Sequence, residues 1–289
     1  MIKLDLEKLK PLVKQALEED IGSGDATTKA IIPESTRVMG KIKAKAKGIV
    51  AGLPVAELVF KMADKRIKFV QRKKDGIKVS AGTVIAEVYG PARGILKAER
   101  VALNFLQKLS GIATTTSEYV NKVRWHPVKI MDTRKTTPCY RELEKYAVAL
   151  GGGVSHRMGL YDGIIIKDNH LSITPDIKKV VAEARKKAPP DMQIEVEANS
   201  LSRVRQAIEA GANIIMLDNM NIFALRAAVR MIQRHNREVG IRQAYIKTEA
   251  SGGVTLRNVR RIARTGVDSI SIGALTHSPK ALDISLEIE

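Results

Sequence analysis

The hydrophobic pattern of the chain changes near residue 128. Before that point, helical patterns are mixed with runs in which apolar and polar residues alternate. After it, short and fully apolar runs alternate regularly with amphipathic helical stretches. Strands that are apolar on both faces and alternate with helices are typical of a parallel sheet covered by helices. The pattern therefore predicts a small α+β domain followed by a larger β/α domain.

The first domain is predicted to cover residues 1–112 and to be joined by the C-terminal tail, residues 277–289. Apolar spacing predicts its elements in this order: helix 3–20, strand 37–50, helix 54–63, strand 67–71 and strand 83–89. A further helical pattern runs from Glu99 to Val123 and is interrupted near Ser110-Gly111, since glycine weakens a helix interior. We therefore expect that helix to break there.

The second domain, residues 113–276, is predicted to be an irregular, incomplete β/α barrel. Apolar runs predict strands at 128–131, 163–166, 193–197, 213–217, 245–249 and 268–272. Helical stretches are expected between them, near 139–150, 175–188, 201–210, 221–236 and 255–265. These units fall short of the eight of a regular barrel. An open, doubly wound sheet is the alternative.

Polar residues follow almost every predicted strand of the second domain. In a β/α barrel the active site lies at the carboxyl ends of the strands. Any one of these residues could cap a helix or carry a surface charge, but their recurrence at successive strand ends predicts a polar site. They are Asp132, Arg134, Lys135, Lys167, Asp168, Asn169, Glu195, Glu197, Asp218, Asn219, Glu249, Ser251, Gly252, Gly253 and Gly273.

The acidic members of this set have two interpretations. Glu195 and Glu197 alternate along one predicted strand, so both side chains point to the same face. If that face is the barrel interior, they must meet cations or a metal, because a buried unpaired carboxylate is costly. The alternative is a structural ion pair with Lys167 or Lys247. Asp218 could instead cap a helix.

The cations and glycines of the set indicate an anionic ligand. Fixed cations stand in Arg134-Lys135, in His156-Arg157 and at Lys167, although His156-Arg157 could equally be a surface pair. Ser251-Gly252-Gly253 and Gly273 each precede a predicted helix. Glycines there let backbone N–H groups approach a phosphate, and the last two loops of a barrel are where phosphate usually binds.

Composition narrows the location and the chemistry. No apolar run approaches the roughly 20 residues of a membrane span, and the first residues lack the apolar core of a secretory signal. The single Cys139 cannot form an intramolecular disulfide and has no partner for a zinc site, which fits a reducing compartment. We interpret it as a small buried hydrophobe rather than a nucleophile. A cytoplasmic protein without a membrane partner is expected.

The formal net charge of +18 admits nucleic acid, an anionic membrane or small polyanionic substrates as partners. Aromatic residues make up only 4%, which supplies few platforms for base stacking. The lysines that alternate from Lys41 to Lys47 lie on one strand face, which we interpret as solvated. A nucleic-acid-binding protein would also not explain acidic residues at the strand ends. No specific nucleic-acid partner is expected.

Six motifs occur in the order and approximate spacing of one known family. They are Asp132-Thr133-Arg134-Lys135-Thr136, Ser155-His156-Arg157, Ile166-Lys167-Asp168-Asn169-His170, Glu195-Val196-Glu197, Met216-Leu217-Asp218-Asn219 and Glu249-Ala250-Ser251-Gly252-Gly253. Over nearly its whole length the chain resembles the quinolinate phosphoribosyltransferases. The resemblance implies an N-terminal α/β domain with an irregular barrel of the type II phosphoribosyltransferases. It also implies transfer of phosphoribosyl from phosphoribosyl pyrophosphate (PRPP) to quinolinate with decarboxylation, giving nicotinate mononucleotide for NAD biosynthesis.

The resemblance also implies roles for individual residues. Quinolinate or PRPP oxygens would be held by Arg100, Thr133, Arg134, Lys135, His156, Arg157 and Lys167. Glu197 and Asp218 would serve the ribose and Mg²⁺, and with Lys135 and Lys167 they would be catalytic. The 5-phosphate would be seated by Ser251, Gly252, Gly253, Gly273 and Ala274. No organic cofactor is implied, and the unit would be a homodimer, or a multiple of dimers, in which Arg100 completes the neighbour's site.

The nearest rival is a relative with the same fold that uses another aromatic acid, such as a nicotinate phosphoribosyltransferase or a molybdenum-associated paralogue. The discriminating residues are those that would meet the second carboxylate. Arg100, Arg134 and His156-Arg157 together favour a diacid.

Overall fold

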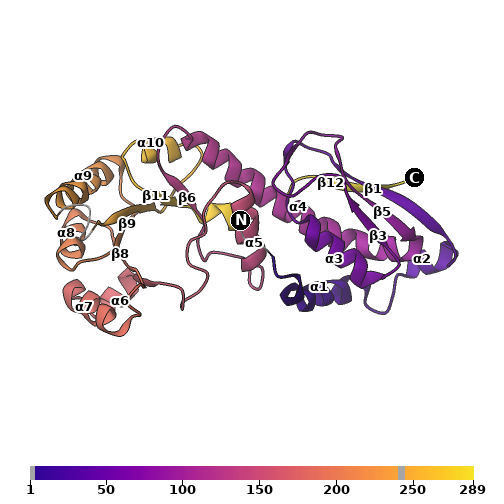
Figure 1. Ribbon diagram of the computed structural model, residues 1–289, viewed down its shortest axis with the longest axis horizontal. Helices are drawn as coiled ribbons and strands as arrows, with labels where there is room; N and C mark the ends of the chain where they lie inside the picture. The colour runs from indigo at the N-terminus through magenta and orange to yellow at the C-terminus, as the bar shows by residue number, and fades with distance from the viewer. Residues whose placement is uncertain (1–3, 240–244) are drawn as a thin grey trace. The chain divides into compact units, whose positions relative to one another are not determined.

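The computed structural model describes residues 4–239 and 245–289 (Figure 1). The chain divides into two compact units, here called unit 1 and unit 2. Unit 1 comprises the chain up to Ser117 together with Thr136–Gly152 and Leu275–Glu289, and unit 2 comprises Glu118–Lys135 and Gly153–Ala274. The segment Thr136–Gly152, which the sequence division placed in the barrel domain, thus belongs to unit 1. Among the described residues, no helix is long and apolar enough to cross a membrane.

Unit 1 is an antiparallel sheet with helices. Its four strands lie in the order β12-β1-β5-β3, where β1 is Arg37–Ala44, β3 is Lys68–Gln71, β5 is Val84–Pro91 and β12 is Ile284–Ile288. A short pair, β2 (Gly48–Ile49) and β4 (Lys78–Val79), stands apart from it. The helices are α1 (Leu6–Ile21), α2 (Ala26–Ile31), α3 (Leu53–Ala63) and α5 (Arg141–Leu150). Hydrophobic spacing predicted α1, α3 and the longer strands, but it missed α2 and β12.

The helix α4 (Ala92–Val123) corrects one prediction, because it runs without a break for 32 residues. Ser110 and Gly111 make tertiary contacts instead of interrupting the helix. The Ser110 hydroxyl accepts a hydrogen bond from the Ala51 amide at 2.9 Å. A Cβ on Gly111 would lie 2.2 Å from the carbonyl oxygen of Lys280. The glycine therefore permits close backbone approach inside unit 1 rather than ending the helix.

Two further features of unit 1 differ from their interpretation. Lys41 is ion-paired at 2.7 Å with Glu289, the residue after β12, and Lys45 at 3.2 Å with Glu287 of β12. The basic strand face is therefore partly neutralised rather than simply solvated. Cys139 is exposed and has a positive φ of 63°, so it is not the small buried hydrophobe that was expected.

Unit 2 is built on a parallel sheet of six strands in the order β6-β11-β10-β9-β8-β7. The strands are β6 (Lys129–Met131), β7 (Ile164–Ile166), β8 (Ile194–Ala198), β9 (Ile214–Asp218), β10 (Lys247–Ser251) and β11 (Ser269–Ser271). The helices are α6 (Asp168–Ile173), α7 (Ile177–Lys187), α8 (Leu201–Glu209), α9 (Ile222–Val239) and α10 (Val259–Ala263). A single-turn helix, α11 (Ala274–His277), follows β11. Of these helices, α6 was not predicted, and α11 is the helix expected after Gly273, for which no range was given.

The sheet of unit 2 is curved but not closed. No strand pairing joins β6 to β7 within the described part of the chain. Helices α7, α8 and α9 contact strands β8, β9 and β10, and so cover the outer face of the sheet (Figure 1). Six strands are too few for a regular closed barrel of this type. The predicted irregular, incomplete barrel is confirmed, and strands β8 and β10 carry glutamates on its inner face.

Candidate active site

The carboxyl ends of the unit 2 strands bring together residues from three neighbouring strands and the start of a helix. Glu197 lies near the end of β8, and Asp218 and Ser251 are the last residues of β9 and β10. Asp218 and Ser251 are direct partners in the sheet, and the pairing of β7 with β8 sets Lys167 beside Glu197. Burial raises the pKa of the Glu197 carboxyl, the charge of Asp218 raises it further, and Lys167 opposes the rise. Two carboxylates and a lysine thus share this end of the sheet.

The residues that follow β9 and β10 contact each other at the carboxyl end of the sheet. The Asn219 amide N–H donates to the Ser251 carbonyl at 3.0 Å, and its side-chain amide donates to Asp218 Oδ2 at 2.7 Å. Gly252 has a φ of 85°, and a Cβ there would lie 2.2 Å from Asn219 Oδ1. The next residue, Gly253, also has a positive φ, of 59°, but a Cβ there would meet no atom within 4 Å. Only glycine fits Gly252, both for its conformation and for the space around it.

The structure decides between two interpretations of Asp218. The next helix, α9, is capped by Asn221, whose Oδ1 accepts from the amides of Phe223 and Ala224 at 3.0 Å each. Asp218 therefore is not the cap of that helix, and its carboxylate faces the strand ends. Among the described residues, Glu195 forms no ion pair with Lys167 or Lys247 either; its charged neighbour is His156.

Further cations stand after β6 and in the segment that leads into β7. Thr133, Arg134 and Lys135 form the turn that follows β6, and the Lys135 amide donates to Thr133 Oγ1 at 3.0 Å. The Arg157 guanidinium donates to the Gly163 carbonyl at 2.7 Å, which fixes its direction. Burial lowers the pKa of Arg157, and the nearby charge of Arg134 lowers it further. Two guanidinium groups that repel each other are stabilised by an anion between them.

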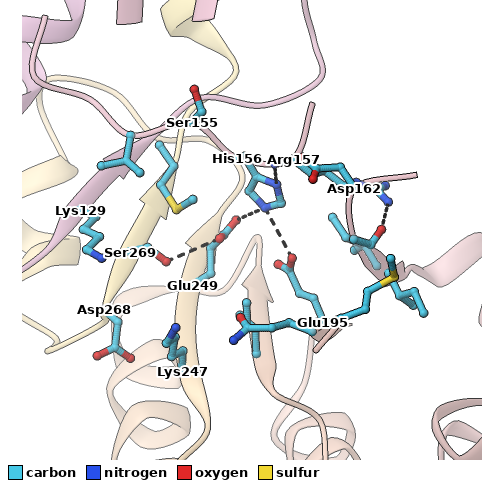
Figure 2. Close-up of a pocket in the computed structure, with 18 of the residues that line it drawn as sticks. Lys129, Ser155, His156, Arg157, Asp162, Glu195, Lys247, Glu249, Asp268 and Ser269 are labelled. Carbon is cyan, nitrogen blue, oxygen red and sulfur yellow. Dashed lines mark hydrogen bonds and ion pairs between the residues drawn. The ribbon is translucent and has the colours of Figure 1, made fainter. Parts of the chain in front are cut away.

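Behind these cations, His156 lies between two buried glutamates (Figure 2). Its Nε2 is 3.4 Å from Glu195 Oε2 and 3.5 Å from Glu249 Oε1. The glutamate residues are only 3% and 2% exposed. Burial lowers the pKa of His156, but the two carboxylates outweigh burial and raise this pKa to about 10. Burial also raises the pKa of Glu195, as does the charge of Glu249.

The backbone around His156 is held in place as well. Its amide N–H donates to Oδ1 of the fully buried Asp132 at 2.8 Å. The Arg157 amide nitrogen lies 2.8 Å from Nδ1, which accepts from it in the neutral tautomer and loses this bond in the imidazolium. The chain enters this segment through a bridge between Val154 and Met131, at the edge strand β6. His156 therefore links β6 to β8 and β10 across the open barrel.

Two sets of donors could be considered for a metal ion. His156, Glu195 and Glu249 offer atoms within 4.8 Å of one another. However, Nε2 carries a hydrogen both in the neutral tautomer that accepts at Nδ1 and in the imidazolium, so it has no lone pair for a metal. Glu197 and Asp218 instead offer carboxylate oxygens on neighbouring strands at the accessible end, which is the donor type that Mg²⁺ prefers.

A cavity of about 1030 Å³ opens at the opposite, amino end of these strands. Lys129, Lys247 and Asp268 line the cavity at that end. His156, Glu195 and Glu249 line its inner part (Figure 2). Of the residues predicted for the site, His156, Arg157, Glu195 and Glu249 line it. Because barrel enzymes react at the carboxyl ends of their strands, and the cations and glycine turns gather there, we assign the candidate active site to that end.

The remaining predicted residues are placed as follows. Gly273 and Ala274 follow Ile272, the residue after β11, whose amide donates to the Met131 carbonyl at 2.9 Å and so continues the pairing of β11 with β6. Both thus lie at the carboxyl end of the unit 2 sheet. Arg100 is exposed on the part of α4 that belongs to unit 1. The predicted residues at the ends of β6, β7, β8, β9 and β10 stand at the same carboxyl end, whereas His156 and Arg157 line the cavity at the amino end.

Sequence reasoning missed three parts of this arrangement. Glu249 was noted as a polar residue at a strand end, but not as a partner of His156. Asp132 was not recognised as the acceptor that anchors the His156 amide. Asn219 was not recognised as the side chain that requires glycine at Gly252. A signal for Glu249 was present, because it stands two residues before Ser251, as Glu195 does before Glu197, and so faces inward too.

Comparison with known proteins gives consistent matches over both units. The family model described as the N-terminal domain of quinolinate phosphoribosyl transferase matches residues 25–110, and the model of its C-terminal domain matches residues 112–287. A probable nicotinate-nucleotide pyrophosphorylase [carboxylating] of Bacillus subtilis (strain 168) is 45% identical over 97% of this chain and 93% of its own length. Quinolinate phosphoribosyltransferase [decarboxylating] 1b of Nicotiana tabacum is 41% identical over 97% of this chain and 82% of its own.

Solved structures agree with these matches. NadC from Streptococcus pyogenes superposes with a TM-score of 0.92 at 38% identity, covering 100% of this chain and 99% of that one. The nicotinate-nucleotide pyrophosphorylase of Francisella tularensis gives 0.90 at 37% identity, covering 99% of this chain and 98% of that one. Human nicotinic acid phosphoribosyltransferase gives 0.59 at 10% identity, covering 99% of this chain and 74% of that one, which shows a shared fold only.

Proposed function

Because the chain belongs to the quinolinate phosphoribosyltransferase family, we propose that it transfers phosphoribosyl from PRPP to the ring nitrogen of quinolinate and releases the 2-carboxylate. The products are nicotinate mononucleotide, pyrophosphate and carbon dioxide. The observation that carries this proposal is the gathering of cations, two carboxylates and a glycine turn at the carboxyl end of the unit 2 strands, within a chain matched by both family domains. The single cysteine fits a reducing compartment, and we place the reaction in the cytoplasm.

The cations of the site suit two highly charged substrates. Quinolinate is a dianion and PRPP carries several negative charges, so both need fixed cations to share one cavity. Arg134 and Arg157 offer the planar geometry that binds a carboxylate through two hydrogen bonds. Lys135 and Lys167 add point charges, and His156, when it is protonated between its glutamates and gives up the bond at Nδ1, adds a further cation. Thr133 holds the Lys135 backbone and lies in the same turn.

The phosphate end of PRPP is assigned to the glycine turns. Gly252 and Gly253 keep the backbone after β10 open, and the Ser251 hydroxyl lies at the same strand end. Gly273 and Ala274 provide the corresponding turn after β11. Backbone amides in such turns can point at a phosphate without an intervening side chain.

The carboxylates suit the step in which pyrophosphate leaves. The bond from C1 of the ribose to pyrophosphate breaks, and C1 becomes positively charged before the ring nitrogen forms its bond. Glu197 and Asp218 stabilise that charge and would also hold Mg²⁺, which when bound offsets the charge of the pyrophosphate. The ring nitrogen is then cationic. When carbon dioxide departs, the electron pair of the broken bond stays on C2, where the cationic nitrogen and Lys135 or Lys167 stabilise the carbanion, and a proton then takes the place of the carboxylate.

The acceptor is proposed to be quinolinate rather than nicotinate, because the site gathers Arg134, Arg157 and His156 where a monoacid needs fewer cations. Arg100, from unit 1 of a second copy in a homodimer, would add a further guanidinium.

The test is an assay with purified protein, Mg²⁺ and PRPP, with quinolinate or nicotinate, in which nicotinate mononucleotide and carbon dioxide are measured together. Equal amounts of both products from quinolinate alone are expected. Reaction of nicotinate without carbon dioxide, or of neither acid, would overturn the substrate assignment but not the fold.

A further inference from the structure

A strongly basic hollow lies on unit 2, and none of its residues belongs to the candidate active site. Its volume is about 290 Å³. It forms between the end of α4, the turn that follows α4 and the segment that leads into α10. The lining residues are Asn121, Lys122, Arg124, Trp125, Leu256, Arg257 and Arg260.

The charge of this hollow is not balanced. Four of its lining residues are cations and none is acidic. In the part of the chain that the structure describes, no carboxylate forms an ion pair with any of the four. Elsewhere on unit 2, by contrast, Arg234 is paired with Glu238 at 2.8 Å. Like charges around one hollow repel one another, and an anion with two or more charges relieves that repulsion.

An aromatic ring stands beside these cations. Trp125 is the one tryptophan of the chain, and it is 76% exposed. The Arg124 guanidinium lies over its ring, 4.8 Å from the centroid. Exposed aromatic rings flanked by cations are the means by which proteins stack bases beside phosphates. The indole is therefore placed to stack on a flat ring of a ligand that also carries negative charge.

The backbone that presents these side chains is held firmly. The hydroxyl of Tyr119, a buried residue of α4, hydrogen-bonds the Leu256 amide. Asn258 closes the neighbouring turn, accepting from the Thr255 amide at 2.8 Å and donating to the Gly253 carbonyl at 2.9 Å. Arg257 and Arg260 are three residues apart across this turn and the first turn of α10. The hollow is thus a built feature rather than a chance approach of long side chains.

We propose that this hollow binds a nucleotide, whose phosphates contact Lys122, Arg257 and Arg260 and whose base stacks on Trp125. Guanidinium groups bind phosphate through paired hydrogen bonds, which favours phosphate over other anions. The volume lies at the lower end of the range of ligand sites, roughly 300 to 1,000 Å³, which fits one nucleotide rather than a strand. The proposal does not depend on the catalytic assignment.

The experiment uses Trp125 as its own reporter. Because no other tryptophan is present, indole emission excited at the red edge of its absorption reports this hollow alone. The whole protein is titrated with ADP, with tripolyphosphate and with adenosine. We expect ADP to change the emission saturably, with a dissociation constant below about 1 mM, and to bind more tightly than tripolyphosphate or adenosine.

Two double variants distinguish binding in the hollow from general electrostatic attraction of ADP to a basic surface. R257Q/R260Q removes two lining cations, and R261Q/R264Q removes two exposed cations nearby on or at the end of α10 that do not line the hollow. The first should raise the dissociation constant about tenfold or more, and the second less than about twofold. Trp125→Ala, followed by calorimetry, should weaken ADP binding about fivefold or more. Both double variants should keep wild-type turnover, which separates this test from that of the proposed function.

Four results would overturn the proposal. One is no saturable response to ADP up to about 10 mM. Another is equal weakening by both double variants, which would indicate general electrostatic attraction. Tripolyphosphate binding as tightly as ADP would rule out the ring contact. An oligonucleotide that displaces ADP with a steep salt dependence would identify a nucleic-acid surface instead.

Discussion

The substitution Gly252→Ala should show whether the turn after β10 requires glycine because of the close contact with Asn219 or because of its positive φ. Gly252 has a φ of 85°, and an alanine Cβ would lie 2.2 Å from Asn219 Oδ1. Ordinary contact begins near 3.4 Å, so Asn219 or the turn must move by about 1 Å. Asn219 also donates to Asp218 at 2.7 Å, so the movement disturbs a proposed catalytic carboxylate. Gly252 thus couples the proposed phosphate turn to Asp218.

The expected loss of kcat/KM follows from three separate effects of the substitution. Alanine at positive φ costs about 1–2 kcal/mol. Loss of a hydrogen bond to a charged group costs about 1.5–3 kcal/mol. Displacing a binding group by about 1 Å can lower a rate by about 100-fold. We expect kcat/KM for PRPP to fall by about two to three orders of magnitude.

The neighbouring glycine is the matched control. Gly253 has a φ of 59°, and a Cβ there meets no atom within 4 Å, so Gly253→Ala carries the conformational strain without the clash. We expect it to lower kcat/KM for PRPP by about tenfold at most. The assay is steady-state kinetics with each substrate varied in turn, alongside thermal unfolding of both variants. If the two variants lose the same activity at the same stability, the contact with Asn219 is not what requires glycine at Gly252.

Three further predictions concern the proposed roles. Glu249→Gln removes one of the two carboxylates that raise the pKa of His156 to about 10, so this pKa should fall. Because His156 is an imidazolium only below its pKa, kcat/KM for quinolinate should begin to decline at a lower pH than in the wild type. An unchanged pH profile would refute the role of Glu249. Lys135→Ala should lower the rate of carbon dioxide release more than quinolinate affinity, as single-turnover assays against equilibrium binding would show; weaker binding with the bound complex reacting at the wild-type rate would contradict this. Arg100→Ala and Lys135→Ala should each be inactive. Mixing and refolding the two variants should restore about one quarter of the wild-type activity, because half of the dimers are then mixed and each mixed dimer has one intact site of two. If mass spectrometry shows mixed dimers but no activity returns, Arg100 serves its own subunit.

Much of the fold follows from the sequence because the strands of unit 2 are short, fully apolar and separated by amphipathic helices. Elements whose reason lies in distant contacts were not predictable. The continuous α4 is an example, since Gly111 looked like a helix breaker, and only the nearby Lys280 carbonyl explains it. The strand β12 is another, because its partner β1 lies more than 200 residues away in the sequence. Local pattern cannot show a requirement that arises from packing between such segments.

The candidate site divides in the same way. Strand alternation alone places Glu195 with Glu197, and Glu249 with Ser251, on inward faces. Strand alternation cannot show what lies on β9, the strand between β8 and β10. The apolar Ile214 and Met216 of β9 face the same interior, so neither Glu195 nor Glu249 finds a cation on that strand. The counter-charge comes instead from His156, on an irregular segment anchored by Asp132. Buried acids on alternate strands therefore require a cation from outside the sheet, and this physical need, rather than any motif, explains why His156 stands where it does.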